Sequence, residues 1–555
     1  MKILNRMFPL SLLGFLVFCL GGCSSKIEEA ESVFINGLVY KVDLDRSWSE
    51  AIAVSEGKIV FVGPSKSAQR YIGPNTQVLD LKNKMVMPGI HDAHTHFLLA
   101  GLQVNSLCKL PFGGTQNDII KALETCAVGL SDDDWLVAGY YYVDQFKSGK
   151  LDRWVLDSAF PDRPVYIHEF SAHHGLANST ALKEAGVNAE TVDPPGGSFK
   201  KNAEGQPTGE LVETATWFVQ QHIPKLSEDI NLAAVAWASR KASSFGITSI
   251  QESAGNREAL QAFKVIDQSN RLNQRAAVHV VLKSSQFGLA SFEDLEQLLS
   301  ERDKYASQRV ETDYVKMWVD GSPTPPYFTE AGFDEESNAI MTQNLLIESE
   351  KLTETVIRLD EEAMKVKMHV AGAGAAHAAL NAIEAAREAN PSSIIRHELG
   401  HTNLVIPEDL ERFSELNAVA EMSPSVWQDY GMELGFPPRP SWQFKSLLAE
   451  NAHMTIGTDW PVTVDPNLFP ALEGMLDRGD ESIALPDALE IMTINGAISL
   501  GWDKELGSIE EGKVANFIVL DRNLFEIPIR EISETRVLKT IFEGKLVFDA
   551  EASVR

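Results

Sequence analysis

Cysteine and basic residues are both scarce in this sequence of 555 residues. Only four cysteines are present, which excludes a disulfide-rich scaffold. The chain has 49 lysine and arginine residues against 78 aspartate and glutamate residues, a formal net charge of −29 at pH 7. Such an acidic chain would repel nucleic-acid phosphates, so we expect no nucleic-acid partner. Hydrophobic residues at 44% and charged residues at 23% are typical of a globular protein with a core.

The most prominent apolar run of the sequence stands at its N-terminus. Two basic residues precede an apolar run over residues 7–20, which is shorter than the roughly 20 residues that a spanning helix needs. The pattern is typical of a secretory signal, and an uncleaved membrane anchor is the alternative. The Leu-Gly-Gly-Cys that follows resembles a bacterial lipobox. We therefore predict a lipoprotein signal peptide over residues 1–22 and a lipid on Cys23, which would anchor the protein in the bacterial cell envelope. Ser24 indicates the outer membrane if the cell is Gram-negative.

Two thiols would remain after the signal is removed and Cys23 is lipidated. These are Cys108 and Cys126. They could pair in an oxidising periplasm or stay free and buried, and the sequence leaves both alternatives open.

The two ends of the mature chain have the character of β-sheet. Residues 33–78 and the last fifty residues consist of short apolar segments, with Asn-Gly and Glu-Gly turns. Since the two pieces are alike, we predict one small β-sandwich domain built from residues 23–87 and 503–555.

The middle of the chain alternates short apolar runs with amphipathic segments, which predicts an α/β fold with a parallel sheet. Polar residues end several of the runs, and this narrows the prediction to a (β/α)8 TIM-like barrel over residues 88–502. That span exceeds the roughly 250 residues of a plain barrel. We therefore predict a large insertion at about residues 103–225, a segment rich in aromatic residues, proline and glycine.

Candidate metal ligands follow the predicted barrel strands. His94 and His96 are two residues apart on an extended segment, so both imidazoles can face one metal ion. The later apolar runs end in a lysine, two further histidines and an aspartate. These four residues are Lys316, His369, His401 and Asp459.

The motifs that contain these residues resemble the amidohydrolase superfamily, specifically amidohydrolase family 3, which includes N-substituted formamide deformylases. The resemblance covers nearly the whole mature chain, and its segments include VMPGIHDAHTH, YVKMWVDGS, HVAGAGAAHAAL, RHELGHTNLV, TIGTDWPV and GSIEEGKVANFIVLD. It implies a metal-dependent amidohydrolase that cleaves a non-peptide C–N bond in a small amide, formamide or N-acyl compound. Metal-activated hydroxide would attack the carbonyl carbon, with one or two divalent ions, expected to be Zn²⁺.

The resemblance also implies a role for each candidate ligand. His94 and His96 would bind the more buried metal, and His369 and His401 would hold the second one. Asp459 would touch the first metal and act as the catalytic residue, because its carboxylate can pass a proton to the leaving nitrogen.

Lys316, if carboxylated on its side-chain nitrogen, would bridge two metals; as an ordinary ion-paired lysine it would leave a site for one metal. His173 is expected either to contact the substrate or to serve a structural hydrogen bond. Trp318 is a pocket wall or a core residue. Glu213 supplies a carboxylate near the pocket or lies on a surface helix.

The chain departs from the family pattern at two positions. Relatives usually carry Glu immediately before the ligand at His401, where this chain has Gly400, and an acid where it has Ala373. No predicted ligand is lost, so we expect the protein to bind metal. The residues that orient the ligands, and the contacts to the substrate, are expected to differ from those of relatives. The neighbours that we expect to support the ligands or the loops are His91, Asp92 and His397.

Two other functions stay open. The same site could cleave an ester, a lactone or a carbamate, or the chain could be a non-catalytic, ligand-binding surface lipoprotein. The intact Asp459 disfavours the binder, which has no need to move a proton. We expect a small-molecule substrate and a membrane contact through the lipid. Relatives often self-associate, so a homo-oligomer is implied by analogy alone.

Overall fold

The computed structural model describes residues 29–111, 114–131, 133–141, 152–282, 292–324, 327–334, 336–424 and 441–552. The predicted signal peptide and the predicted lipid site at Cys23 lie outside these residues. Within the described residues, no helix has both the length and the apolar character that a membrane crossing requires.

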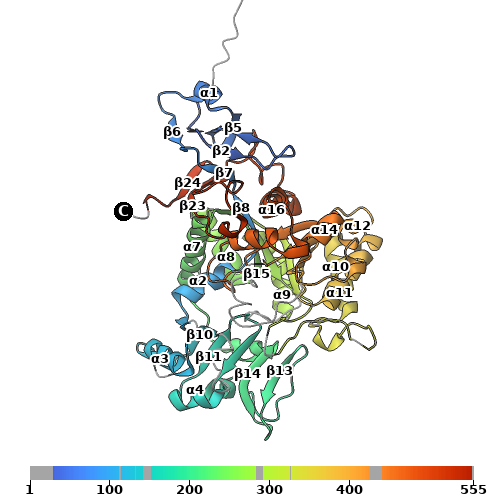
Figure 1. The fold of residues 1–555 in the computed structure, drawn as a ribbon. Coiled ribbons are helices and arrows are strands. Elements are labelled where there is room, and N and C mark those ends of the chain that lie inside the picture. The colour runs from blue at the N-terminus through green and yellow to red at the C-terminus, as the bar shows by residue number, and fades with distance from the viewer. Residues whose placement is uncertain are drawn as a thin grey trace, which may run out of the picture.

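Eight parallel strands form the centre of the described structure and confirm the predicted TIM-like barrel (Figure 1). Each strand pairs with its neighbour in chain order, and a parallel bridge between Thr95 and Trp460 joins the first strand to the segment after the last. The barrel strands are β8 (Ile90–Thr95), β15 (Ile247–Gly255), β16 (Arg275–Val281), β17 (Val310–Trp318), β18 (Lys365–His369), β19 (Glu398–Gly400), β20 (Val419–Met422) and β21 (His453–Ile456).

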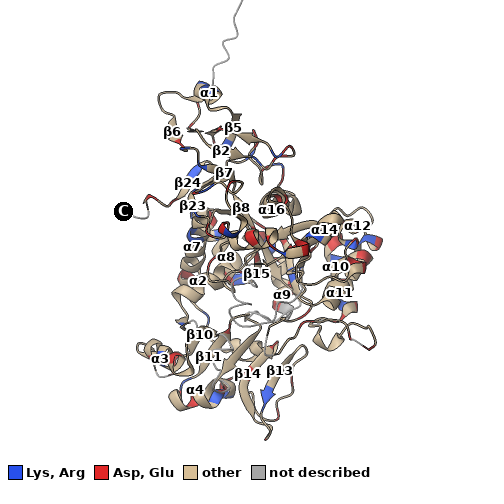
Figure 2. Ribbon diagram, viewed as in Figure 1, with Lys and Arg blue, Asp and Glu red and all other residues tan. Residues whose placement is uncertain are grey.

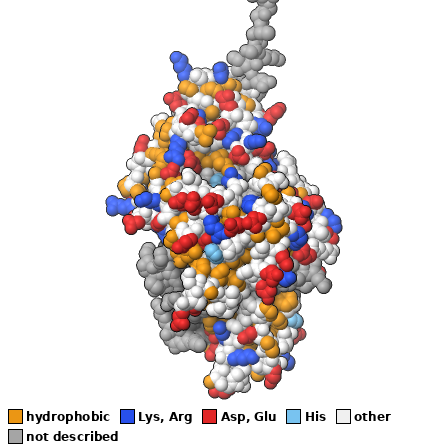
Figure 3. All heavy atoms as spheres, turned by 90° about the vertical axis from the view of Figure 1, so that its right-hand side faces the viewer, with side chains coloured by type: hydrophobic (Ala, Val, Ile, Leu, Met, Phe, Trp, Pro, Cys, Tyr) orange, Lys and Arg blue, Asp and Glu red, His pale blue; other side chains and the backbone are white. Residues whose placement is uncertain are grey.

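Amphipathic helices cover the outside of the barrel, as α8 (Arg257–Gln268) illustrates. The side chain of Asn256 accepts a hydrogen bond from the backbone N–H of Ala259 and caps the first turn. Leu260, Phe263 and Ile266 recur at helical spacing and are fully buried. Other covering helices are α7 (Glu228–Ser244), α10 (Ser349–Glu361) and α11 (Ala373–Ala389). Acidic and basic residues are dispersed along the helices in Figure 2, and their side chains are intermixed on the face drawn in Figure 3.

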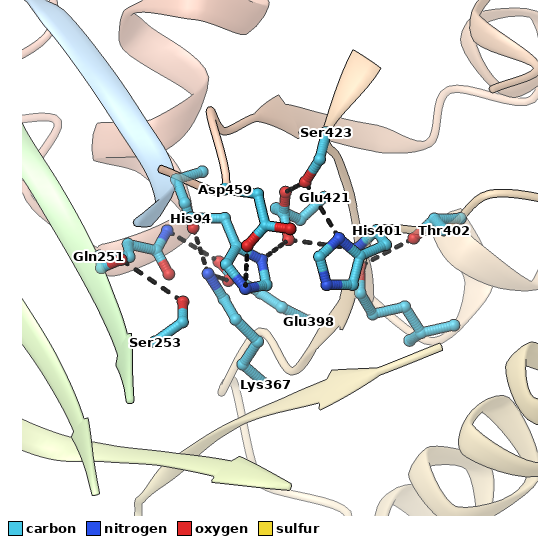
Figure 4. Close-up of polar contacts among 12 residues, drawn as sticks. His94, Gln251, Ser253, Lys367, Glu398, His401, Thr402, Glu421, Ser423 and Asp459 are labelled. Atoms are coloured by element: carbon cyan, nitrogen blue, oxygen red, sulfur yellow. Dashed lines mark hydrogen bonds and ion pairs between the residues drawn. The ribbon is translucent and has the colours of Figure 1, made fainter. Parts of the chain in front are cut away.

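The barrel interior is polar. Glu398 is fully buried, and its two carboxylate oxygens lie 2.5 Å from Lys365 Nζ and 3.2 Å from Lys367 Nζ. Gln251 Nε2 donates to the same carboxylate at 3.3 Å. In a usual barrel, branched apolar residues fill the interior. Here an ion-paired layer takes their place next to the candidate site (Figure 4).

Strands from both chain ends share one sheet beside the barrel. In that sheet β7 from the N-terminal part pairs with β22 from the C-terminal part. Phe517 on β22 contacts Phe34 of the second sheet edge-on, at 4.9 Å between ring centroids. Its strands are β2 (Leu38–Tyr40), β3 (Trp48–Ser49), β7 (Met85–Pro88), β22 (Phe517–Leu520), β23 (Val537–Phe542) and β24 (Lys545–Asp549). A second sheet consists of β1 (Ser32–Ile35), β4 (Ala51–Ser55), β5 (Lys58–Gly63) and β6 (Gln77–Asp80).

The segment predicted as an insertion holds a third sheet, which we call the lobe, on the side of the barrel away from the two terminal sheets (Figure 1). Its strands are β9 (Cys108–Lys109), β10 (Leu136–Tyr141), β11 (Val165–Glu169), β12 (His174–Ala177), β13 (Gly197–Lys201) and β14 (Pro207–Glu213). A disulfide joins Cys108 on β9 to Cys126 on α3 (Gln116–Ala127). Of the two alternatives for these thiols, the structure therefore has the paired one.

Candidate active site

A cavity lies where the carboxyl ends of the barrel strands meet the lobe. Its volume is about 730 Å³, including the part that is open to solvent. The barrel supplies its floor, and the lobe supplies part of its wall through Tyr140, Phe170 and His173. The cavity is also lined by every residue predicted to bind metal or substrate: His94, His96, His173, Lys316, Trp318, His369, His401 and Asp459.

Three of these side chains form a compact group that can hold a metal ion. One donor atom from each of His94, His401 and Asp459 lies within 4.8 Å of the other two. Asp459 Oδ1 lies 3.2 Å from His96 Nε2 and 3.8 Å from His94 Nε2. Imidazole nitrogens with a carboxylate oxygen are donors that zinc prefers, so the residues present fit such an ion.

Burial keeps three of the four candidate imidazoles in the neutral form that binds metals, whereas at His96 the Asp459 and Glu252 carboxylates outweigh burial and raise the pKa. The pKa values of His94, His369 and His401 all lie well below the ordinary histidine value, first because burial disfavours the imidazolium and then because positive groups lie nearby. A neutral imidazole has a lone pair for a metal ion.

His369 reaches the cavity with a different orientation from the compact group. It ends β18, and its ring centroid lies 4.5 Å from that of His401. Its Nε2 lies 3.2 Å from the backbone carbonyl oxygen of Gly321. The structure thus places His369 beside the other candidate ligands, while its Nε2 contacts a backbone carbonyl.

The segment after β21 fixes Asp459 against β8. The backbone N–H of Asp459 donates to the His94 carbonyl at 2.7 Å, and the side-chain hydroxyl of Thr458 donates to Asp92 at 2.7 Å. Gly457 allows this approach, because a Cβ there would lie only 2.4 Å from the His94 backbone nitrogen. The sequence Ile-Gly-Thr-Asp therefore brings the carboxylate to the paired histidines.

Lys316 lies inside the cavity, and no carboxylate of the described residues forms an ion pair with it. Its Nζ is 3.0 Å from His94 Nε2 and 5.1 Å from the centre of the Trp318 ring. Burial lowers the pKa of the Lys316 amine to about 7. Within the described residues it forms no ion pair with a carboxylate, so the ion-paired alternative is not what the structure shows. Trp318 is 2% exposed and lines the cavity, so it is both a packed residue and a wall.

On the substrate side, a histidine and a glutamate of the lobe form a pair. His173 Nδ1 lies 2.8 Å from Glu213 Oε2, and both side chains are buried. Burial works to lower the pKa of His173, but the Glu213 carboxylate outweighs it and the pKa lies above the ordinary value. Glu213 ends a lobe strand, so of the two sequence alternatives the structure has the carboxylate near the pocket.

One supporting carboxylate escaped the sequence analysis. Glu421 on β20 is fully buried, with Oε2 2.6 Å from His94 Nδ1. Burial raises the pKa of this carboxyl to about 7, while the Lys367 and Lys316 ammonium groups oppose that rise. The only sequence feature that could have indicated this role is that Glu421 lies in the strand that follows His401. His397, in contrast, bonds to Asp360 and lies outside the cavity lining.

Comparisons with known proteins identify the family and the fold of the chain. A model of the amidohydrolase family matches residues 77–548. Protein LONG AFTER FAR-RED 3 of Arabidopsis thaliana is 27% identical over 94% of this chain and 92% of its own length. An N-substituted formamide deformylase of Arthrobacter pascens is 25% identical over 94% and 99%. The crystal structure of an uncharacterized metal-dependent hydrolase from Pyrococcus horikoshii has the same fold, with a TM-score of 0.69, 20% identity, and coverage of 90% and 99%.

Proposed function

This chain belongs to the amidohydrolase family and is a hydrolase of carbon–nitrogen bonds other than peptide bonds, and we propose that its substrate is a small amide, formamide or N-acyl compound. The observation that carries the proposal is the compact group of His94, His401 and Asp459 at the floor of a cavity. The similarity to an N-substituted formamide deformylase supports the bond type.

The residues that would hold a divalent ion, expected to be zinc, are His94, His96, His401 and Asp459, and His369 would join them in a site for two ions. Their donor atoms are those that suit zinc. Such an ion, when bound, lowers the pKa of water and polarises a carbonyl group.

The chain itself would then move protons and orient the substrate. The Asp459 carboxylate would accept a proton from the attacking water and deliver it to the leaving nitrogen. His173, held through Nδ1 by Glu213, would donate from Nε2 to the substrate carbonyl oxygen, where negative charge develops. Trp318 would form an apolar wall beside the reacting bond.

We propose in addition that Lys316 is carboxylated by carbon dioxide when two ions bind. Burial lowers the pKa of this amine, which favours the unprotonated, nucleophilic form. Its attack on carbon dioxide would form the N–C bond and release one proton to solvent, and the carbamate would offer two anionic oxygens to the ions. Carbon-13 NMR of protein loaded with labelled bicarbonate and zinc tests this. A carbamate signal that is absent from Lys316→Met is the expected result.

The location of the protein is proposed from its first residues. The signal-like segment and the lipobox-like Cys23 support a lipid-anchored protein of the cell envelope. The Cys108–Cys126 disulfide is consistent with an oxidising compartment. Membrane fractionation of wild type and Cys23→Ala tests the proposal, and equal release of both into the soluble fraction would contradict it.

Metal content and turnover test the proposed function together. The purified chain, supplied with zinc, is assayed for bound metal and for amine release from N-formyl and N-acyl amines, with matched esters in parallel. We expect near-stoichiometric zinc and faster cleavage of the amides. His94→Ala removes a ligand and should lose both, whereas His222→Ala, an exposed control, should keep both. Protein that binds no zinc would refute the proposal.

A further inference from the structure

A single buried carboxylate holds two of the three side chains in the compact group (Figure 4). Glu421 Oε2 lies 2.6 Å from His94 Nδ1 and accepts the backbone N–H of His401 at 3.2 Å. Its other oxygen, Oε1, accepts from the hydroxyl of Ser423 at 3.2 Å. That hydroxyl lies 3.1 Å from His401 Nδ1. Glu421 therefore reaches one imidazole directly and the other through Ser423.

These contacts determine which nitrogen of each imidazole faces the cavity. In its ionised form the Glu421 carboxylate only accepts hydrogen bonds, so His94 then carries its proton on Nδ1, and the lone pair remains on Nε2. The Ser423 hydroxyl has one proton, and when it donates to Glu421 its oxygen accepts from His401 Nδ1. Both imidazoles then present Nε2 as the metal-binding atom. His94 Nε2 lies toward Lys316 and Asp459, as this assignment requires.

We propose that Glu421 is a positioning residue that fixes the tautomer and the ring orientation of His94 and His401 for a divalent cation, an assignment that rests on the metal dependence in the proposed function. Carboxylates that hold metal-binding histidines raise the basicity of the ligand and keep the ring in place. Because one carboxylate serves both rings, its loss would disturb two ligands at once.

The neighbouring strand leaves room for this carboxylate. A Cβ on Gly400 would lie 3.3 Å from Glu421 Oε2 and 3.5 Å from His94 Cε1. A glutamate side chain spans a similar distance between its Cβ and its carboxylate, so position 400 could supply a carboxylate to the same place. The two positions cannot both do so, which makes a transposition of the carboxylate a direct test.

The experiment compares zinc affinity, measured by competition with a chromophoric chelator, among variants of the full chain. For Glu421→Gln, which keeps the size and removes the charge, we expect affinity to fall about 10–100-fold. Ser423→Ala breaks only the connection to His401 and should cause a smaller loss. In cobalt-loaded protein, the visible spectrum of Glu421→Gln should also change, because the orientation of the ligands differs.

Asp360→Asn is the matched control. Asp360 is also a buried carboxylate that holds a buried histidine, with Oδ1 2.9 Å from His397 Nε2, but this pair lies outside the cavity lining. Its loss should lower stability and leave zinc affinity unchanged. The double variant Gly400→Glu, Glu421→Ser returns a carboxylate to the same place and should bind zinc more tightly than Glu421→Ser alone.

The proposal is overturned if Glu421→Gln folds and binds zinc within about twofold of wild type, where supporting carboxylates typically contribute tenfold or more. A folded double variant that binds no better than Glu421→Ser overturns it too. If Glu421→Gln does not fold, Ser423→Ala decides by the same twofold criterion. Wild type that binds zinc but cleaves no amide would refute the proposed reaction and leave this assignment standing; wild type that binds no zinc refutes both.

Discussion

Asp459→Asn separates proton transfer from folding. The substitution keeps the size of the side chain, and asparagine tolerates the φ of 54° at this position. The backbone hydrogen bond from Asp459 to His94 does not involve the side chain, so the segment after β21 should keep its place. The substitution removes the charge that faces His96 Nε2 at 3.2 Å and the base that would take a proton from water.

The magnitude follows from the role assigned to this carboxylate. General acid–base catalysis contributes about 10²–10⁴-fold, which corresponds to about 3–5 kcal/mol in the activation free energy. Since the Asp459 side chain is only 14% exposed and lines the cavity, water cannot fully replace it. We therefore expect kcat for amide cleavage to fall by at least that factor. Because Asp459 would also hold the ion, zinc affinity should fall as well, while the Tm of the metal-free protein stays unchanged.

The assay measures amine release at saturating substrate with zinc-loaded protein. Asp465→Asn is the control, because Asp465 lies on the same segment but forms an exposed ion pair with Lys241. Its kcat should equal that of wild type. A folded, zinc-loaded Asp459→Asn that turns over as fast as wild type would show that another group moves the proton.

Three further predictions concern metal binding and stability. Zinc at 100 times its dissociation constant should stabilise wild type by about 2.7 kcal/mol, seen as a higher Tm that His94→Ala does not show. Glu398→Gln leaves the buried lysines without their carboxylate partner and should lower the free energy of unfolding by about 3–5 kcal/mol. An unchanged urea midpoint would show that the ion-paired layer does not contribute to stability. Replacing Cys108 and Cys126 by alanine opens a loop of 18-residue separation and should cost about 3 kcal/mol, with no further loss upon adding reductant.

The barrel and the convergence of the candidate ligands on one cavity could be predicted because their signals are local. Each ligand stands at or just beyond the end of a short apolar run, and parallel strands bring their carboxyl ends to one edge. His94 and Asp459 meet for this reason although they are 365 positions apart, and the bridge from Thr95 to Trp460 joins the same two segments. The pairing of Cys108 with Cys126 could not be settled, because it depends on how α3 packs on the lobe.

What the sequence could not provide is the register between neighbouring strands. Leu399 pairs with Ala420 in the barrel, so Gly400 and Glu421 follow beside each other. His174 pairs with Val212 in the antiparallel sheet of the lobe, so His173, which precedes the first, lies beside Glu213, which follows the second. A shift of one residue in either pair would turn the carboxylate to the opposite face of its sheet. Both histidine–carboxylate contacts therefore depend on non-local pairing, and a glutamate near the end of a strand does not reveal such a partner by itself.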